Sequence, residues 1–133
     1  MPPSQRRHVV KLTANFEHNL RDIQAFLLQA EAPQAFDALL DELAEIVIPN
    51  LERFPGMGRR FLARQAHSVE VASAQERLVQ QLNAIASGGE IREYVMTHHL
   101  LLYAHLPASV VLLSIRHQQQ LSFDFQAHWP TAG

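Results

Sequence analysis

Residues Glu90 to His117 read EIREYVMTHHLLLYAHLPASVVLLSIRH, and this stretch decides the fold. It holds three runs suited to strands: Ile91–Met96, Leu100–Leu106 and Val110–Ile115. The second and third runs are short and almost wholly apolar, which is typical of strands buried on both faces, or on one face and part of the other. Breaks of about three residues separate the runs, and Pro107 in the second break cannot donate to a strand ladder. The stretch therefore predicts a three-stranded antiparallel meander.

The chain before this meander supplies a short strand and two helices that can cover it. The strand is expected over His8–Thr13 because apolar side chains dominate there. A first amphipathic helix follows, and its apolar stripe consists of Phe16, Leu20, Ile23 and Leu27. A second helix is expected from Pro33 to Val47, closed by Pro49, and its apolar face consists of Phe36, Leu39, Leu40, Leu43, Ile46 and Val47. The short connection between them predicts an antiparallel helical hairpin.

The remaining segments are an arm, a loop and an insertion. Residues 1–7 are polar and contain proline, so a flexible arm is expected. Leu51–Phe61 contains one Pro and two Gly, which predicts an ordered loop. In the insertion 62–89, a capping box at Ser73–Glu76 predicts a helix over Ala74–Ala86. The apolar stripe of this helix, formed by Leu78, Leu82 and Ile85, is compatible with covering the sheet or with forming a homodimer.

These elements predict one α+β domain over residues 1–133. Its expected architecture is an antiparallel sheet, made of the N-terminal strand and the C-terminal meander, covered by the helical hairpin, with one extra inserted helix. Apolar residues make up 47% of the chain and charged residues 18%, and the formal net charge is −2. This charge gives no strong attraction to nucleic acid. The chain has no cysteine and no apolar run long enough to span a membrane, and a cytoplasmic protein is therefore expected.

Several motifs in a fixed order carry a family resemblance. The loop reads LERFPGMGR from Leu51 to Arg59, and the strands contain the motifs IREYV (Ile91–Val95), LLY (Leu101–Tyr103) and LSIRH (Leu113–His117). After a strand and a helical hairpin, this series resembles the RelE/ParE superfamily of type II toxin–antitoxin toxins, which includes plasmid stabilisation proteins. The resemblance spans roughly residues 9–117. This chain departs from many members in being slightly acidic and in carrying the insertion 62–89 between the loop and the sheet.

The resemblance implies one of two functions that share a fold. RelE-like members are metal-independent endoribonucleases, or mRNA interferases, that cut mRNA on the ribosome. ParE-like members lack the nuclease residues and inhibit growth by binding DNA gyrase. In both classes a cognate antitoxin neutralises the toxin by wrapping its C-terminal segment along the helical hairpin and across the sheet. No cofactor is implied.

Metal-free RNA cleavage needs a base for the 2′-hydroxyl, an acid for the leaving oxygen, and cations for the developing phosphorane charge. If the chain is an RNase, the candidate catalytic residues are Arg92, Tyr94, Arg116 and His117. Strand alternation puts Arg92 and Tyr94 on the face opposite Glu93, and it sends Arg116 and His117 to opposite faces if both lie in the strand. The distribution of these candidate residues over two faces and the near-neutral charge of the chain favour the ParE-like class. The end of the last strand at His117 also resembles the ParE branch.

The same residues also have structural interpretations. Tyr103 among leucines is typical of a core tyrosine with a hydrogen-bonded hydroxyl. Arg92 could pair with a carboxylate across strands, and His117 could form hydrogen bonds at a strand end. The eight histidines raise the question of a metal site, but His98 and His99 diverge in an extended chain and no His-x-x-x-His motif is present. The sequence therefore predicts no metal site.

A partner surface is expected on the helical hairpin and on the loop that follows it. Exposed apolar side chains suit the docking of an antitoxin segment. The residues singled out for antitoxin or target binding are Phe54, Met57, Arg59, Arg60 and Arg64. A third interpretation is a degenerate, non-toxic member that only binds its antitoxin. The interpretations leave the cellular target open between gyrase and mRNA on the ribosome.

Overall fold

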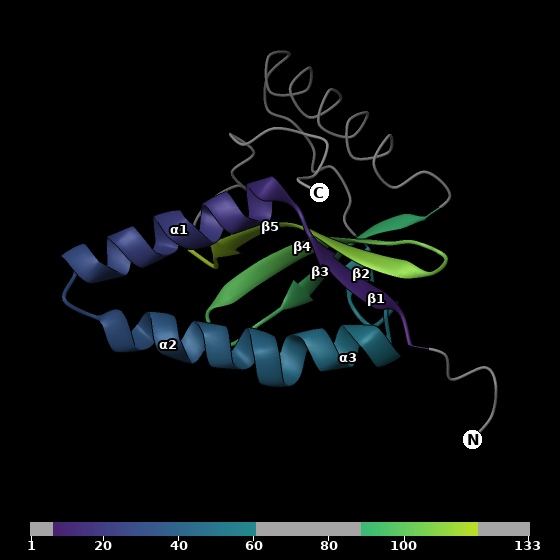
Figure 1. Ribbon diagram of the computed structural model, residues 1–133, viewed down its shortest axis with the longest axis horizontal. Helices are drawn as coiled ribbons and strands as arrows, with labels where there is room; N and C mark the ends of the chain where they lie inside the picture. The colour runs from purple at the N-terminus through teal and green to yellow at the C-terminus, as the bar shows by residue number, and fades with distance from the viewer. Residues whose placement is uncertain (1–6, 61–88, 120–133) are drawn as a thin grey trace, which may run out of the picture.

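The computed structural model describes residues 7–60 and 89–119. The expectations for residues 1–6 of the arm, for Arg64 and for the inserted helix lie outside these residues. The described chain folds into a five-stranded sheet with helices on one face, so the expected α+β class is confirmed (Figure 1). The sheet order is β1-β5-β4-β3-β2, and the bounds are β1 Val9–Leu12, β2 Arg59–Arg60, β3 Glu90–Val95, β4 His99–His105 and β5 Ser109–His117.

The predicted meander is confirmed as β3, β4 and β5. Both of its strand pairs are antiparallel, and β5 extends two residues beyond the predicted Ile115. Its β4–β5 register shifts between Leu102 and Tyr103, which leaves one extra residue on β5. Because of this shift, His99 at the start of β4 faces His117 at the end of β5.

The sheet is mixed, whereas a wholly antiparallel sheet was expected. Strand β1 pairs with β5 in parallel, with Val9 opposite Ser109 and Leu12 opposite Leu112. Apolar content can identify β1 as a strand, but it carries no information on the direction of its neighbour. That direction follows from the path of the chain, which leaves β1, crosses one face of the sheet as helices and returns through the meander.

Helix α1, Ala14–Gln29, is fixed to β5 by buried polar groups that the apolar stripe did not predict. Thr13 accepts a 3.0 Å hydrogen bond from the Phe16 N–H as the N-cap, and it donates to the Leu112 carbonyl at 2.9 Å. The Asn19 side-chain oxygen accepts from the Ser114 hydroxyl at 2.7 Å and from the Ile115 N–H at 3.1 Å. These contacts set both the position and the direction of α1 on the sheet.

The second helical segment continues beyond Pro49, and the expected stop there is wrong. Helix α2, Pro33–Glu42, passes through a π-helical turn, Leu43–Val47, into α3, Ile48–Arg53. A proline inside an α-helix clashes with the carbonyl four residues earlier, whereas a π turn widens the backbone at that point. Pro49 occupies the first turn of α3, where no intrahelical N–H donor is required.

The helices pack on one face of the sheet, and both faces of the central strands are buried. The core between helices and sheet contains Phe16, Phe36, Leu39, Leu43, Val47, Leu51, Met96, Leu101, Tyr103, Val110, Leu112 and Ile115. Alternation places Leu100, Leu102 and Ala104 of β4 on the opposite face, and these residues are buried as well. The two-sided burial predicted from the apolar runs is therefore confirmed. Among the described helices, none is both long and apolar enough to cross a membrane.

Candidate functional site

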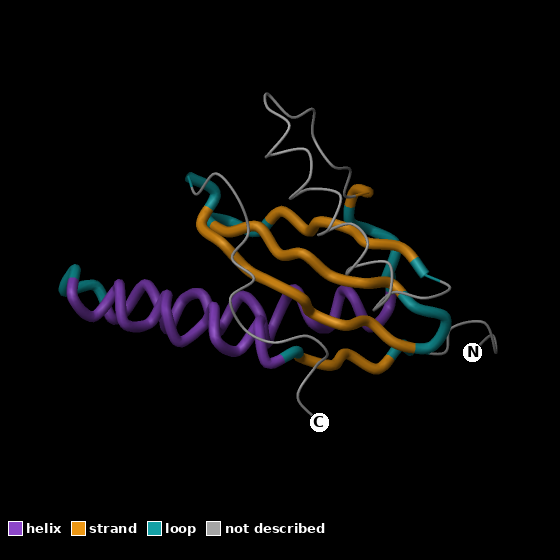
Figure 2. Tube along the Cα trace, turned by 90° about the horizontal axis from the view of Figure 1, so that it is seen from above, coloured by secondary structure: helices purple, strands orange, loops and turns teal. Residues whose placement is uncertain are grey.

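An apolar groove lies between the helical hairpin and one end of the sheet. Helices α1 and α2 project beyond the strand ends, so the inner side of the hairpin is only partly covered (Figures 1 and 2). The groove encloses about 580 Å³. Its lining consists of Asp22, Ile23, Phe26, Leu27, Ala35, His98, His99, His117 and Gln119. Volume and lining are in the range that binds a small ligand or the side chains of a partner segment.

The hairpin side of the groove is apolar because the α1 stripe continues past the edge of the core. Ile23 and Leu27 still pack against the core, whereas Phe26 is 69% exposed. The hairpin is held over the sheet end by Glu42, whose carboxylate accepts hydrogen bonds from the Thr97 N–H at 2.9 Å and the Thr97 hydroxyl at 3.1 Å. This contact places the β3–β4 turn, and with it His98 and His99, below the hairpin.

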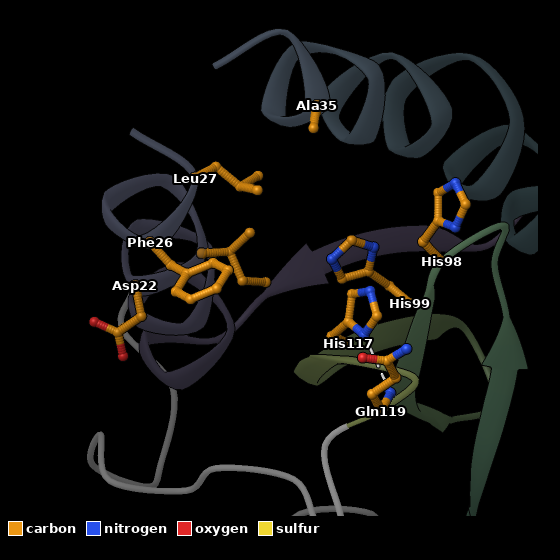
Figure 3. A pocket seen from close by; sticks show the side chains of 9 residues that line it. Asp22, Phe26, Leu27, Ala35, His98, His99, His117 and Gln119 are labelled. Atoms are coloured by element: carbon orange, nitrogen blue, oxygen red, sulfur yellow. Dashed lines mark hydrogen bonds between the residues drawn. The ribbon is translucent and has the colours of Figure 1, made fainter. Parts of the chain in front are cut away.

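Three histidines, His98, His99 and His117, line the sheet side of the groove together with Gln119 (Figure 3). The rings of His99 and His117 lie edge to face with their centroids 5.3 Å apart. The pKa of His99 is lowered to about 4, mainly by burial and also by the charges of the neighbouring His117 and His98, while the Glu42 carboxylate opposes this shift. His99 is therefore neutral at pH 7. The Nδ1 atom of His117 accepts a 3.1 Å hydrogen bond from the Gln119 N–H.

Sequence reasoning placed His98 and His99 in a turn and did not connect them with His117. His99 belongs to β4, directly opposite His117. The His-His pair was detectable in principle, because the two residues lie at the outer ends of adjacent antiparallel runs. The bulge between the strands prevented an exact register from being read from the sequence.

A second polar cluster lies at the β2–β3 edge of the sheet. Strand β2 was expected as part of a loop, but Arg59 and Arg60 pair with Glu93 and Arg92 of β3. Two salt bridges cross these strands, from Arg59 to Glu93 at 3.1 Å and from Arg60 to Glu90 at 3.2 Å. The opposite charges of Arg59 and Glu93, which face each other, favour this pairing, and Glu90 bonds to both Arg60 and Arg92, which also face each other. The strand is too short to show an alternating pattern.

Arg92 and Tyr103 hold the loop before β2 in place. The Arg92 guanidinium bonds to Glu90 at 2.6 Å and donates a hydrogen bond to the Gly58 carbonyl. The hydroxyl of Tyr103, a fully buried residue, donates to the Pro55 carbonyl at 2.7 Å and accepts from the Gly58 N–H at 3.0 Å. Burial raises the pKa of this hydroxyl above its usual value, so it remains protonated. Tyr103 thus has the hydrogen-bonded core role expected of it.

The candidate nuclease residues are divided between separate places. Arg92 and Tyr94 share the helix-covered face, where the Tyr94 hydroxyl accepts a 3.3 Å hydrogen bond from the Asn50 amide. Arg116 and His117 both belong to β5 and, as alternation requires, lie on opposite faces. Arg116 shares the far face with Glu93, whose charge opposes the lowering of the Arg116 pKa by burial.

Arg92 and His117 share a face but lie far apart along the sheet. Arg92 is opposite Tyr103 and His117 is opposite His99, so they are four positions apart along β4. At the usual rise per residue this separation is roughly 13 Å. A phosphate held by Arg92 would therefore be out of reach of the His117 imidazole.

The binding residues singled out in the loop are at the surface. Phe54 is 60% and Met57 is 48% exposed, and the side chains of Arg59 and Arg60 are 57% and 69% exposed. Within residues 7–60 and 89–119, no three His, Asp or Glu side chains lie close enough to hold a metal ion.

No protein-family model matches the chain, and no curated protein is similar to it in sequence.

Proposed function

We propose that this chain is the toxin of a type II toxin–antitoxin system, of the RelE/ParE type, that acts in the cytoplasm and is neutralised by a cognate antitoxin. The observation that carries the proposal is the apolar groove between a projecting helical hairpin and the end of a β-meander. A disordered segment that folds on binding needs such a preformed apolar surface. The order of strand, hairpin, Pro-Gly loop and meander along the described chain supports the family assignment.

The groove suits an apolar partner segment better than a charged substrate. Ile23, Phe26 and Leu27 supply one wall, and the neutral His99 ring supplies part of the other. An amphipathic helix or extended segment could bury its apolar side chains there and leave its polar side towards solvent. The antitoxin docking inferred from the family resemblance uses the same helical hairpin.

The positions of the cationic residues favour the ParE-like branch, in which the toxin binds and inhibits DNA gyrase. Arg59, Arg60 and Arg92 are all paired with carboxylates, which offset the positive charge that a phosphate would meet there. His117 lies beyond the reach of a phosphate at Arg92. RNA cleavage requires a base, an acid and cations around one phosphate, and the described residues do not gather such a set.

The proposal is tested by inducible expression in a bacterial host without the antitoxin. DNA supercoiling, the SOS response and transcript integrity should be followed within minutes of induction. We expect SOS induction and DNA breaks with intact mRNA. Rapid cleavage of transcripts at ribosome-occupied positions would instead assign the chain to the RelE-like nucleases, and harmless expression of folded protein would support a non-toxic antitoxin-binding member.

Two single substitutions separate the branches. Arg92→Ala and His117→Ala should each leave growth inhibition intact if the chain inhibits gyrase, provided that circular dichroism shows a folded protein. Gln24→Ala, on the exposed side of α1, is a control for expression level. Loss of inhibition in folded Arg92→Ala and His117→Ala, together with loss of transcript cleavage, would contradict the gyrase assignment.

A further inference from the structure

The loop between α3 and β2 presents two large apolar side chains at the surface. Phe54 is 60% exposed and Met57 is 48% exposed. We call residues Phe54–Gly58 the anchored loop. Large apolar side chains exposed three residues apart in one loop can supply the contacts of a protein partner.

The backbone of the anchored loop is fixed at both ends and in its middle. The Phe54 N–H donates to the Asn50 carbonyl at 2.7 Å, and the Met57 N–H donates to the Phe54 carbonyl at 3.0 Å. The Tyr103 hydroxyl holds Pro55 and Gly58, and the Arg92 guanidinium holds the Gly58 carbonyl. Four side-chain and backbone groups thus keep Phe54 and Met57 in position before any partner arrives, which lowers the entropy lost on binding.

The surface around the anchored loop is cationic towards solvent. In the Arg59–Glu93 pair the arginine side chain is 57% exposed and the carboxylate side chain 11%. In the Arg60–Glu90 pair the values are 69% and 39%. In both ion pairs the guanidinium is therefore the more exposed partner, and Glu93 is the carboxylate that is largely covered. Arg53, the last residue of α3, is also exposed.

We propose that the anchored loop, with Arg53, Arg59 and Arg60, binds an acidic peptide segment that carries a large apolar side chain. The apolar side chain packs against Phe54 and Met57, and the flanking carboxylates meet the exposed guanidinium groups. The inference stands on the contacts of the loop itself. Only the identification of this segment with part of an antitoxin rests on the proposed function.

The contacts favour a peptide over a nucleic acid. A nucleic acid presents a continuous row of phosphate charges, and Glu93 and Glu90 offset much of the positive charge of Arg59 and Arg60 that such a row would meet, whereas a peptide needs only one or two charged contacts. Base stacking needs a series of aromatic faces, and the anchored loop supplies one, Phe54. A carboxylate of a peptide can approach the exposed side of each guanidinium without displacing its glutamate partner, because a guanidinium has five N–H donors.

The test selects peptides against the purified full chain. A displayed library of random twelve-residue peptides is panned, and selected peptides are synthesised with a fluorescent label for anisotropy measurements. We expect selected peptides to combine Asp or Glu with Phe, Leu or Trp. Replacing their acidic residues by Lys should abolish binding. Enrichment of neutral or basic peptides, or no enrichment at all, would overturn the proposal.

Two substitutions in the protein locate the binding site. Phe54→Ala should weaken binding of the selected peptides at least about tenfold, the loss typical of a central apolar contact. Leu28→Ala removes a similarly exposed side chain from the hairpin, outside the groove lining, and should change nothing. Equal effects of the two substitutions would overturn the assignment, as would tighter, Phe54-dependent binding of a labelled twelve-nucleotide poly(U) RNA. None of these outcomes depends on toxicity in cells, so this proposal and the toxin proposal can fail separately.

Discussion

The hydroxyl of Tyr103 is bound to the backbone of Gly58, whose N–H donates to it over 3.0 Å. The same hydroxyl donates to the Pro55 carbonyl over 2.7 Å. A side chain in the middle of the central β4 strand therefore determines the shape of a surface loop that lies 45 residues away in sequence. Because the loop carries Phe54 and Met57, the core and the candidate binding surface are directly coupled.

Removing this hydroxyl should destabilise the protein. Tyr103→Phe keeps the ring in the core but leaves the buried Gly58 N–H without its partner, and we expect a loss of about 1–3 kcal/mol in the free energy of unfolding. Urea denaturation measures this loss of unfolding free energy. Tyr94→Phe is the matched control, because its hydroxyl accepts a longer, 3.3 Å bond in a partly buried site and its loss should cost below about 1 kcal/mol. Equal costs would contradict the role given to Tyr103.

A side chain at Gly58 should be much more harmful than one at Gly56. A Cβ at Gly58 would lie 2.4 Å from the Glu93 carbonyl oxygen and 2.7 Å from the Tyr103 hydroxyl, so backbone would have to move. A Cβ at Gly56 would meet its nearest atom at 3.7 Å. We expect Gly58→Ala to lower the unfolding free energy by about 2 kcal/mol or more, and Gly56→Ala to change it by less than about 0.5 kcal/mol. Thermal denaturation of both variants checks the difference.

Asn19 should be essential for the attachment of α1 to the sheet. Its side-chain oxygen accepts hydrogen bonds from Ser114 and Ile115, and Asn19 is 3% exposed. Asn19→Ala leaves buried donors unsatisfied, and we expect a loss of about 2–3 kcal/mol in unfolding free energy. Gln24→Ala, on the solvent side of the same helix, controls for changes in helix propensity. A variant as stable as the wild type would show that water replaces the amide without cost.

Stability should fall as the solution becomes acidic, and His99 should account for part of the fall. The pKa of His99 is about 4 in the folded protein and near 6.5 when unfolded, so between these values only the unfolded chain takes up the proton. The contribution is therefore complete above pH 6.5 and is lost as the pH falls towards 4, by up to about 3 kcal/mol. Urea denaturation at several pH values measures the slope.

The slope should become shallower in His99→Gln, because glutamine does not titrate. His98→Gln is the comparison, since His98 is exposed and is only a lesser cause of the low His99 pKa, so most of the slope should remain. A profile of His99→Gln that superimposes on the wild type would contradict the low pKa. The pKa of His105 is also lowered, mainly by burial, and it should leave a residual slope of the same sign in both variants.

Phe26 should matter for the partner and not for folding. Its side chain is 69% exposed on the wall of the groove, so Phe26→Ser should change the unfolding free energy by less than about 1 kcal/mol. If an antitoxin docks in the groove, co-expression should no longer restore growth fully, and affinity should drop about tenfold or more. Rescue of the variant as complete as that of the wild type would exclude the groove as the docking site.

Local patterns in the sequence were sufficient for most of the elements. The apolar runs after Glu90 specified the strands of the meander, and the stripe beginning at Phe16 specified the buried side of α1. Thr13, of a residue type that favours N-cap positions, caps α1. Each of these features depends on neighbours within a few residues, where side-chain spacing and backbone preference act directly.

The pairing of distant segments was decided by the tertiary structure. The parallel partner of β1, the continuation of the helix past Pro49, the short β2 strand and the meeting of His99 with His117 all depend on contacts that no local pattern contains. The sequence by itself determined which residues form strands, helices and core faces, because the spacing of apolar side chains along the chain sets which side of each element is buried. Only the packed fold decided register, strand direction and the pairing of charges. These features depend on which segments, far apart in the sequence, bury their apolar surfaces against each other.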